Sequence, residues 1–193
     1  QKGVLGIIGA GNFTNMTVLP SLKGSDAQLK MIASSGGASG TQCAKKYGIS
    51  QSTTDYKEIL NDNDIDTVII TTRHGSHGKL VIESLNAGKN TFVEKPLALN
   101  QDELNQIIEA FNSKQPNAKS KKLTVGFNRR FSPHLIKVKQ SMGNSAGAVN
   151  IIANMNAGFI PKGHWVHDLE SGGGRIIGEA CHLMDICVFL AGS

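Results

Sequence analysis

The sequence is poor in aromatic residues, cysteines and long apolar runs, and each shortage disfavours a class of protein. Aromatic residues make up 5% of the 193 residues and do not alternate with basic ones, which disfavours a nucleic-acid-binding platform. The three cysteines (Cys43, Cys181 and Cys187) lack metal-site spacing, so we interpret them as free thiols in a reducing cytoplasm. Neither a signal peptide nor a membrane-spanning run is recognisable, so we expect no membrane partner.

The remaining composition is that of a globular protein. Hydrophobic residues make up 39% and charged residues 18% of the chain, and the net charge of +5 suits an anionic small molecule as ligand. The chain starts at Gln1 almost directly on a predicted strand and ends just after a helical pattern. We therefore expect a fragment of a longer protein, truncated within its C-terminal domain.

Apolar runs alternate with helical patterns over the first two thirds of the chain. Predicted strands at residues 4–8, 29–34, 67–71, 91–93 and 123–126 are separated by predicted helices, which indicates a doubly wound parallel sheet of the α/β class. The rhythm then changes to a helix from residue 132 to about 142, a long strand at 148–156, and a helix from about 179. We predict a Rossmann domain at 1–126 and the N-terminal part of an incomplete α+β domain at 127–193.

A glycine-rich turn follows the first predicted strand. Gly9 permits a tight turn, Gly11 allows a pyrophosphate to approach the backbone, and the next helix offers free N–H groups to phosphates. Asn12 and Phe13 continue this loop, and Thr14 stands where the third glycine of the fingerprint is expected. The alternative is a tight turn in a sheet without a nucleotide.

The end of the second predicted strand lacks an acidic residue. Ser34 and Ser35 are followed there by two glycines, whereas NAD-dependent enzymes usually place at this position an acid that binds the ribose hydroxyls. Hydroxyls and glycines leave room for a 2′-phosphate, although no arginine is present to bind it. Lys45 and Lys46 are the nearest candidate cations, and the pattern favours NADP over NAD.

Lys95 ends a buried strand in the run Thr-Phe-Val-Glu-Lys-Pro at residues 91–96. Ligands bind at the carboxyl ends of strands in open α/β sheets, so an ammonium group here is a candidate for proton transfer. The alternative is a surface lysine that forms a salt bridge with Glu94.

Several local motifs occur together in one order. They are Gly-Ala-Gly-Asn-Phe at 9–13, Thr-Thr-Arg-His-x-x-His at 71–77, Glu-Lys-Pro at 94–96, Gly-Phe-Asn-Arg-Arg-Phe at 126–131, and Gly-Gly-Gly-Arg at 172–175 followed by His182-x-x-Asp185. Over essentially the whole chain, this order resembles the Gfo/Idh/MocA oxidoreductase family. The resemblance implies a Rossmann domain, a second domain with an open, mostly antiparallel sheet, and homo-oligomers formed through that domain when it is complete. It also implies hydride transfer between NAD(P) and a hydroxyl or keto carbon of a sugar, cyclitol or sugar nucleotide.

The resemblance also implies the catalytic residues. The lysine of the family corresponds to Lys95 and its histidine to His182, and both would share the proton work at one substrate carbon. Many members carry an aspartate four residues before the histidine, where this chain has Gly178. Glu179 follows directly, rotated by about 100° on a helix, and is the candidate substitute. The alternative role for His182 is a helix histidine satisfied by a neighbour such as Asp185.

Further site candidates follow from the family resemblance and from the types of residue in the motifs. The predicted cofactor-binding residues are Gly9, Gly11, Asn12, Phe13, Ser34, Ser35, Thr71, Thr72, Arg73, His77, Glu94 and Lys95, although His77 is equally consistent with packing at a helix N-terminus. The predicted substrate-binding residues are Lys95, Arg129, His164, Trp165 and His182. His164, His167, Asp168 and His182 resemble a metal-ligand set, but they lack regular spacing and we expect no metal.

Rival functions remain open at this point. The chain could be a non-catalytic NADP-binding regulatory or interaction domain, or a catalytically incomplete fragment of a larger dehydrogenase. An acyclic substrate such as an imine or biliverdin is a further alternative, although the polar loop around His164 favours a hydroxylated ring.

Overall fold

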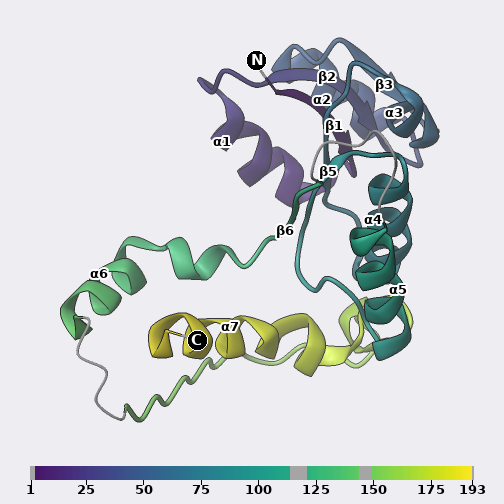
Figure 1. The fold of residues 1–193 in the computed structure, drawn as a ribbon. Coiled ribbons are helices and arrows are strands. Elements are labelled where there is room, and N and C mark those ends of the chain that lie inside the picture. The colour runs from purple at the N-terminus through teal and green to yellow at the C-terminus, as the bar shows by residue number, and fades with distance from the viewer. Residues whose placement is uncertain (1–2, 114–120, 144–148, 193) are drawn as a thin grey trace.

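A computed structural model describes residues 3–113, 121–143 and 149–192. Its centre is a six-stranded, fully parallel sheet in the order β3-β2-β1-β4-β5-β6 (Figure 1). This order reverses direction between β1 and β4, as in a Rossmann fold, and confirms the predicted doubly wound sheet. The strands are β1 (Val4–Ile8), β2 (Gln28–Ala33), β3 (Gln51–Thr53), β4 (Thr67–Ile70), β5 (Asn90–Val93) and β6 (Leu123–Val125).

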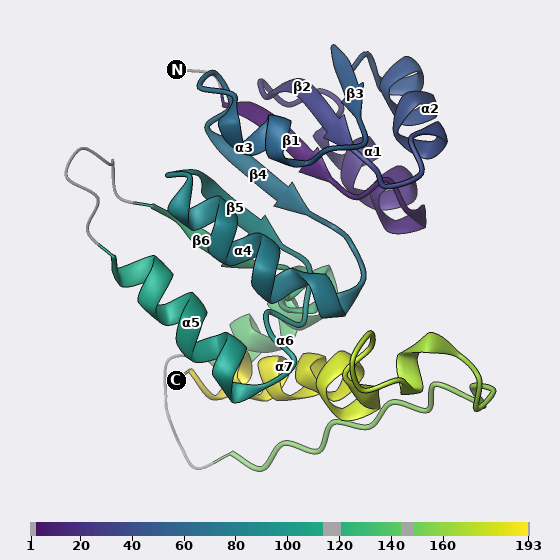
Figure 2. The ribbon, with the colours of Figure 1, turned by 90° about the vertical axis from the view of Figure 1, so that its right-hand side faces the viewer.

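Helices cover both faces of the sheet, which explains why its strands are apolar on both sides (Figure 2). Side chains alternate along β1: Ile7 packs with residues of α1 (Leu19–Leu22) and α2 (Ala38–Tyr47). Ile8 belongs to the opposite cluster, with residues of α3 (Lys57–Asn61), α4 (His77–Asn86) and α5 (Gln101–Asn112). Ile7 is 0% exposed and Ile8 is 4% exposed. The alternation thus builds two apolar layers around one sheet.

The helices begin and end where the sequence offers caps. Asn100 Oδ1 accepts a hydrogen bond from Glu103 N at 2.8 Å, and Glu103 Oε2 accepts one from Leu99 N at 2.9 Å, so α5 starts with reciprocal capping. Gly48 ends α2 in the left-handed region at φ 67°. Because all strand pairs are parallel, the carboxyl ends of the strands lie at one edge of the sheet, where the candidate site is found.

The second part of the chain consists of helices and loops. It contains α6 (Pro133–Met142), a π-helical turn (Ile176–Ala180) and α7 (Cys181–Ala191). The predicted long strand at 148–156 is wrong, because residues 149–156 have no strand structure and residue 148 lies outside the described residues. An extended apolar segment becomes a strand only when another strand satisfies its backbone groups, and none pairs with it in the described part of the chain.

The backbone has two further features. One is β3, a polar three-residue strand that pairs with β2 and that the sequence analysis missed. The other is the peptide bond between Lys95 and Pro96, which is cis. Within the ranges that the structure describes, no helix is long and apolar enough to cross a membrane.

Candidate active site

The glycine loop after β1 is built for close approach of the backbone. Gly9 has φ 113°, and a Cβ at this position would lie 2.8 Å from Thr71 Oγ1 and 2.9 Å from the Thr71 carbonyl. Only glycine combines this dihedral angle with this contact. A Cβ at Gly11 would meet no atom within 4 Å, so the loop is open at this position.

Thr14 explains why the fingerprint tolerates a residue other than glycine at its third position. The side chain is 0% exposed, and Thr14 Oγ1 donates to Gly9 O at 3.0 Å and lies 2.7 Å from Thr71 Oγ1. The hydroxyl therefore ties the start of the helix to the turn and to the end of β4. A small polar residue performs here the packing that glycine performs elsewhere.

A pocket of about 360 Å³ lies where β4 and β5 end. It receives residues from the glycine loop, from the segments after both strands, and from the second part of the chain. A cleft at the carboxyl edge of a parallel sheet, next to its switch point, is the standard ligand position of this architecture. The lining residues are Phe13, Thr71, Thr72, Arg73, His74, His77, Glu94, Lys95, Asn128, Trp165 and His182.

Lys95 is held in the wall of this pocket. Its side chain is 14% exposed, and Nζ donates to Gly178 O at 2.6 Å. Glu179 Oε1 lies 3.8 Å from the same nitrogen. The alternative considered for this lysine, a salt bridge with Glu94, is not formed: Glu94 packs against Gly126, and burial raises the pKa of its carboxyl group. The lysine thus faces the second part of the chain, with Glu179 as its nearest acid.

His182 enters the pocket from α7. It is 5% exposed, and its Nδ1 is buried without a hydrogen-bond partner among the described residues. Burial, reinforced by the positive charges of Lys95 and Arg129, lowers the pKa of His182 to about 4. The imidazole is therefore neutral near pH 7. Asp185 does not satisfy it, because that carboxylate binds Arg130, with Nε at 3.0 Å from Oδ2.

Two histidines from the segment after β4 have different surroundings. His77 is 0% exposed; Nδ1 lies 2.8 Å from Pro96 O and Nε2 lies 3.1 Å from Thr72 O. Both nitrogens thus lie within hydrogen-bond distance of a backbone carbonyl, and a neutral ring donates to one of the two, which supports the packing role considered for this residue. His74 bonds through Nδ1 to Gly172 O at 2.9 Å, and its ring stands edge-on to Trp165 at 5.0 Å. Burial lowers the pKa of both rings.

A second pocket, of about 230 Å³, lies at the ends of β1 and β2. Ser34 and Ser35 line it, as expected for the ribose end of a dinucleotide. Its wall contains hydroxyl groups and one ammonium group, and no carboxylate. The lining residues are Ile8, Ala33, Ser34, Ser35, Thr54, Tyr56, Ser76, Lys79 and Leu80.

Not every predicted site residue reaches a pocket. Asn12 is exposed and lines neither. Arg129 points to Glu179, at 3.9 Å, and to Met155 Sδ, at 3.1 Å, so its guanidinium is engaged away from the wall. His164 is exposed and accepts a hydrogen bond from Val166 N at 3.4 Å, which caps a short helical turn.

The structure adds pocket residues that the sequence analysis did not select. His74 and Asn128 line the larger pocket, and Lys79 lines the smaller one. His74 stands three residues before His77 in the motif after β4, and that spacing was the available signal. Across residues 3–113, 121–143 and 149–192, no group of three or more His, Cys, Asp or Glu side chains is arranged to hold a metal ion.

The sequence of the sheet region decides the family. Residues 4–127 match the profile of the Gfo/Idh/MocA oxidoreductases, described as an oxidoreductase family with an NAD-binding Rossmann fold. The chain belongs to the Gfo/Idh/MocA family. This confirms the resemblance carried by the motifs at residues 9–13 and 94–96.

Relatives within the Gfo/Idh/MocA family match nearly the whole chain. An uncharacterized oxidoreductase of Bacillus subtilis, YrbE, is 28% identical over 98% of this chain and 54% of its own length. An inositol 2-dehydrogenase of Rhizobium meliloti is 29% identical over 97% of this chain and 54% of its own. A levoglucosan dehydrogenase in complex with NADH and levoglucosan superposes with a TM-score of 0.80 and 25% identity, over 100% of this chain and 55% of that one. The chain thus spans about half the length of the relatives that it matches.

Proposed function

We propose that this chain is the cofactor-binding part of an NAD(P)-dependent oxidoreductase, together with part of its active site. Its substrate would be a sugar, cyclitol or sugar nucleotide that reacts at a hydroxyl or keto carbon. The observation that carries the proposal is the convergence of Lys95 and His182, from two parts of the chain, in one pocket at the carboxyl edge of the sheet.

The residues present fit a nicotinamide dinucleotide. Gly9 keeps the backbone free of a Cβ where the chain packs against Thr71, and Gly11 has open space where a Cβ would lie. The two pockets, at the ends of β4 and β5 and at the ends of β1 and β2, offer room for the two halves of a dinucleotide. When bound, NAD(P) would supply the hydride acceptor or donor of the reaction.

The remaining chemistry falls to the side chains of the larger pocket. In the reduction direction the Lys95 ammonium group would donate a proton from Nζ to the carbonyl oxygen of the substrate, and in the oxidation direction the resulting amine would take the hydroxyl proton back; Glu179, at 3.8 Å, would stabilise the protonated lysine. Neutral His182 would hydrogen-bond the same hydroxyl and orient it. In this scheme Glu179 supplies the acid that is missing at Gly178, and Trp165 and His74 form an aromatic wall against which a ring could stack.

We further propose a cofactor preference, domain boundaries, a substrate class and a cellular location. The absence of an acid after β2 supports NADP over NAD. Residues 1–126 would form the Rossmann domain, and residues 127–193 would begin the domain that completes the substrate pocket and forms homo-oligomers. The inositol 2-dehydrogenase and the levoglucosan dehydrogenase among the relatives support a carbohydrate substrate and no nucleic-acid partner. A cytoplasmic location remains part of the prediction.

Binding and turnover test the proposal separately. We expect the wild-type chain to enhance and shift the fluorescence of NADPH or NADH, and Lys95→Met to weaken this binding far less than it lowers turnover. Turnover with a panel that includes inositol and levoglucosan is expected to fall by about a thousandfold in Lys95→Met, because general acid–base catalysis contributes about 10²–10⁴-fold. Full turnover by Lys95→Met would contradict the catalytic role. Cofactor binding without turnover by the wild type would favour the non-catalytic or incomplete-fragment alternatives.

A further inference from the structure

The smaller pocket is lined by a lysine, Lys79, that comes from helix α4 and not from the loop after β2. Lys79 lies in the first turn of α4, near the positive end of the helix dipole, where a cation is electrostatically unfavourable. Among the described residues that line this pocket it is the one cationic residue, and Ser34 and Ser35 from the end of β2 line the same pocket. Its placement thus adds positive potential to the pocket.

Lys79 is only loosely held by other side chains. Its side chain is 71% exposed, and among the described residues its ion-pair partner is Glu83, with Oε1 at 3.9 Å from Nζ. Glu83 also accepts a hydrogen bond from Tyr56 OH at 2.9 Å through its other oxygen. An exposed pair at this distance contributes little, so the ammonium group can turn toward a ligand at small cost.

The rest of the pocket wall favours an anion over ribose hydroxyls alone. Five of its described lining residues carry hydroxyls, namely Ser34, Ser35, Thr54, Tyr56 and Ser76, and none of these lining residues carries a carboxylate that would repel a phosphate. Lys45 and Lys46, the cations that the sequence offered, lie in the last turn of α2, whereas the loop after β2 leads into the first turn of that helix. Lys45 and Lys46 therefore lie far from the pocket in which they were expected to bind the 2′-phosphate.

We propose that Lys79 is the residue that selects NADP over NAD, by binding the 2′-phosphate at the adenosine end of the cofactor. The inference rests on the proposed function, because it requires a dinucleotide across the carboxyl edge of the sheet. Lysine binds phosphate as a flexible point charge, so a lysine on α4 that lines the same 230 Å³ pocket as Ser34 and Ser35 suits the task. The selection thus comes from the helix after β4, and not from the β2 loop where such residues are usually sought.

Binding of adenosine-end probes tests the inference without requiring a complete substrate pocket. Calorimetry with 2′,5′-ADP, compared with 5′-AMP, isolates the 2′-phosphate, and titrations with NADPH and NADH extend the test to the whole cofactor. In Lys79→Gln we expect affinity for 2′,5′-ADP and NADPH to fall about tenfold, as for the loss of one charge-assisted hydrogen bond. Affinity for 5′-AMP and NADH is expected to change less than about twofold. Lys79→Glu should reverse the preference.

Lys45→Glu is the matched control for Lys79→Glu, since it makes the same charge change on an exposed lysine outside the pocket. It is expected to alter the affinity for NADPH less than about twofold. An equal loss of both cofactors in Lys79→Gln would overturn the inference and indicate contact with the adenine ring. An unchanged NADPH affinity, or a wild-type preference for NADH, would also overturn it while leaving the oxidoreductase proposal intact. Failure of the wild type to bind either cofactor would refute the proposed function itself.

Discussion

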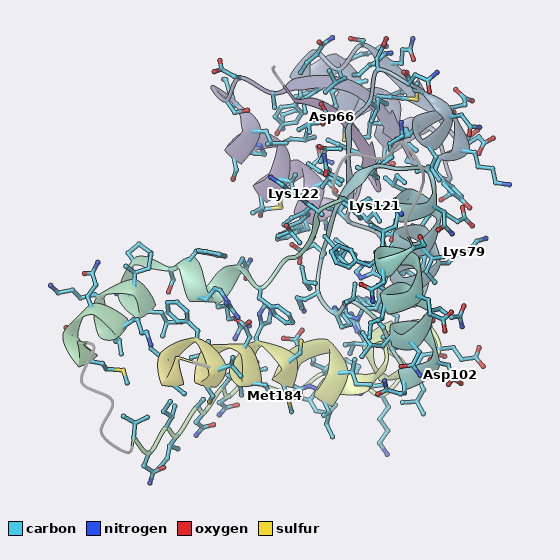
Figure 3. All side chains as sticks on the ribbon, viewed as in Figure 1. Asp66, Lys79, Asp102, Lys121, Lys122 and Met184 are labelled. Carbon is cyan, nitrogen blue, oxygen red and sulfur yellow. The ribbon has the colours of Figure 1, made fainter. Side chains whose placement is uncertain are left out.

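The two parts of this chain bury their apolar side chains to very different extents. Both core clusters are built from residues up to Val125, whereas most of the large hydrophobic side chains that are exposed lie beyond residue 126. In α7, Met184 is 60% exposed and lies on the side of the helix away from the sheet (Figure 3). The first part therefore carries its own core, and the second part has apolar surface that nothing in the described chain covers.

The candidate site lies where these unequal parts meet. Lys95 donates to Gly178 O, His74 bonds to Gly172 O, and Gly75 N donates to Ser171 O at 3.1 Å. Each of these bonds joins the sheet part to the loop and helix that carry His182. Cofactor binding should accordingly depend on the sheet part alone, whereas the catalytic pair depends on the docking of the second part.

The largest contrast is expected between isoleucines in the two parts. Ile70→Ala removes a side chain that is 0% exposed in β4 and should lower the free energy of unfolding by about 2–5 kcal/mol. Ile176→Ala makes the same chemical change at a side chain that is 73% exposed and should cost less than about 0.5 kcal/mol. Urea unfolding of the two variants measures the difference. Equal losses would show that the second part has a buried core in solution.

A smaller effect is expected from the charge state of His182. Its pKa of about 4 in the folded chain lies below the ordinary value of 6.5, so between these pH values the unfolded chain binds the extra proton. Stability should therefore fall as the pH drops from about 6.5 to about 4, by about 2–3 kcal/mol from this residue. Above pH 6.5 the ring is neutral in both states and the contribution is constant.

His182→Gln removes this pH dependence. The difference in unfolding free energy between pH 7 and pH 4.5 should shrink relative to the wild type, while His134→Gln, an exposed substitution on α6, should leave it unchanged. Some slope will persist, because burial also lowers the pKa of His74 and His77. An unaltered slope in His182→Gln would mean that the second part does not bury this ring.

Much of the sheet part was predictable because local signals and tertiary structure agree there. The run at residues 4–8 is apolar on both faces, Gly9 is required by its dihedral angle and contact, and the predicted strands correspond to five of the six observed. The exception, β3, is polar and only three residues long, so no hydrophobic pattern marks it. It forms because β2 offers an edge to pair with.

The second part was less predictable because its structure depends on distant partners. Residues 149–156 have a strand-like pattern without a strand to pair with. The roles of Arg129 and His164 were assigned from the types of residue, whereas in the structure Arg129 contacts Glu179 and His164 accepts a hydrogen bond from a nearby backbone N–H group.

In the sheet part, Lys79 was missed because it lines the pocket from a helix, 45 residues away from Ser34 in sequence. Sequence spacing does not encode such approaches.

A more modest stability change is expected from the ion pair between Arg130 and Asp185, which fixes α7 to the helical turn Asn128–Phe131. The Asp185 side chain is 5% exposed and that of Arg130 is 32% exposed. Arg130→Met leaves a mostly buried carboxylate without its donor, which should cost about 1–2 kcal/mol after allowance for solvent at the arginine. Calorimetric unfolding measures the loss, and cofactor affinity should remain unchanged. Reduced cofactor affinity in this variant would contradict the independence of the sheet part.

The smallest change probes the contact between the two parts most directly. A Cβ at Gly178 would lie 3.2 Å from His74 Cε1 and 3.4 Å from Gly172 O, so Gly178→Ala requires His74 to shift by a few tenths of an ångström. The better helix propensity of alanine offsets this strain, and the net change in stability should stay within about 1 kcal/mol. Because the His74 ring stands edge-on to Trp165, the emission of that single tryptophan should nevertheless change.

Gly163→Ala is the matched control, since a Cβ there meets nothing within 4 Å. Its tryptophan emission should equal that of the wild type, and His74→Ala combined with Gly178→Ala should relieve the strain that the single substitution introduces. If Gly178→Ala left the emission unchanged, the second part would not be docked on the segment after β4 in solution. Lys95 would then lose the Gly178 carbonyl that holds its ammonium group, and the two parts would have to be joined by contacts other than these.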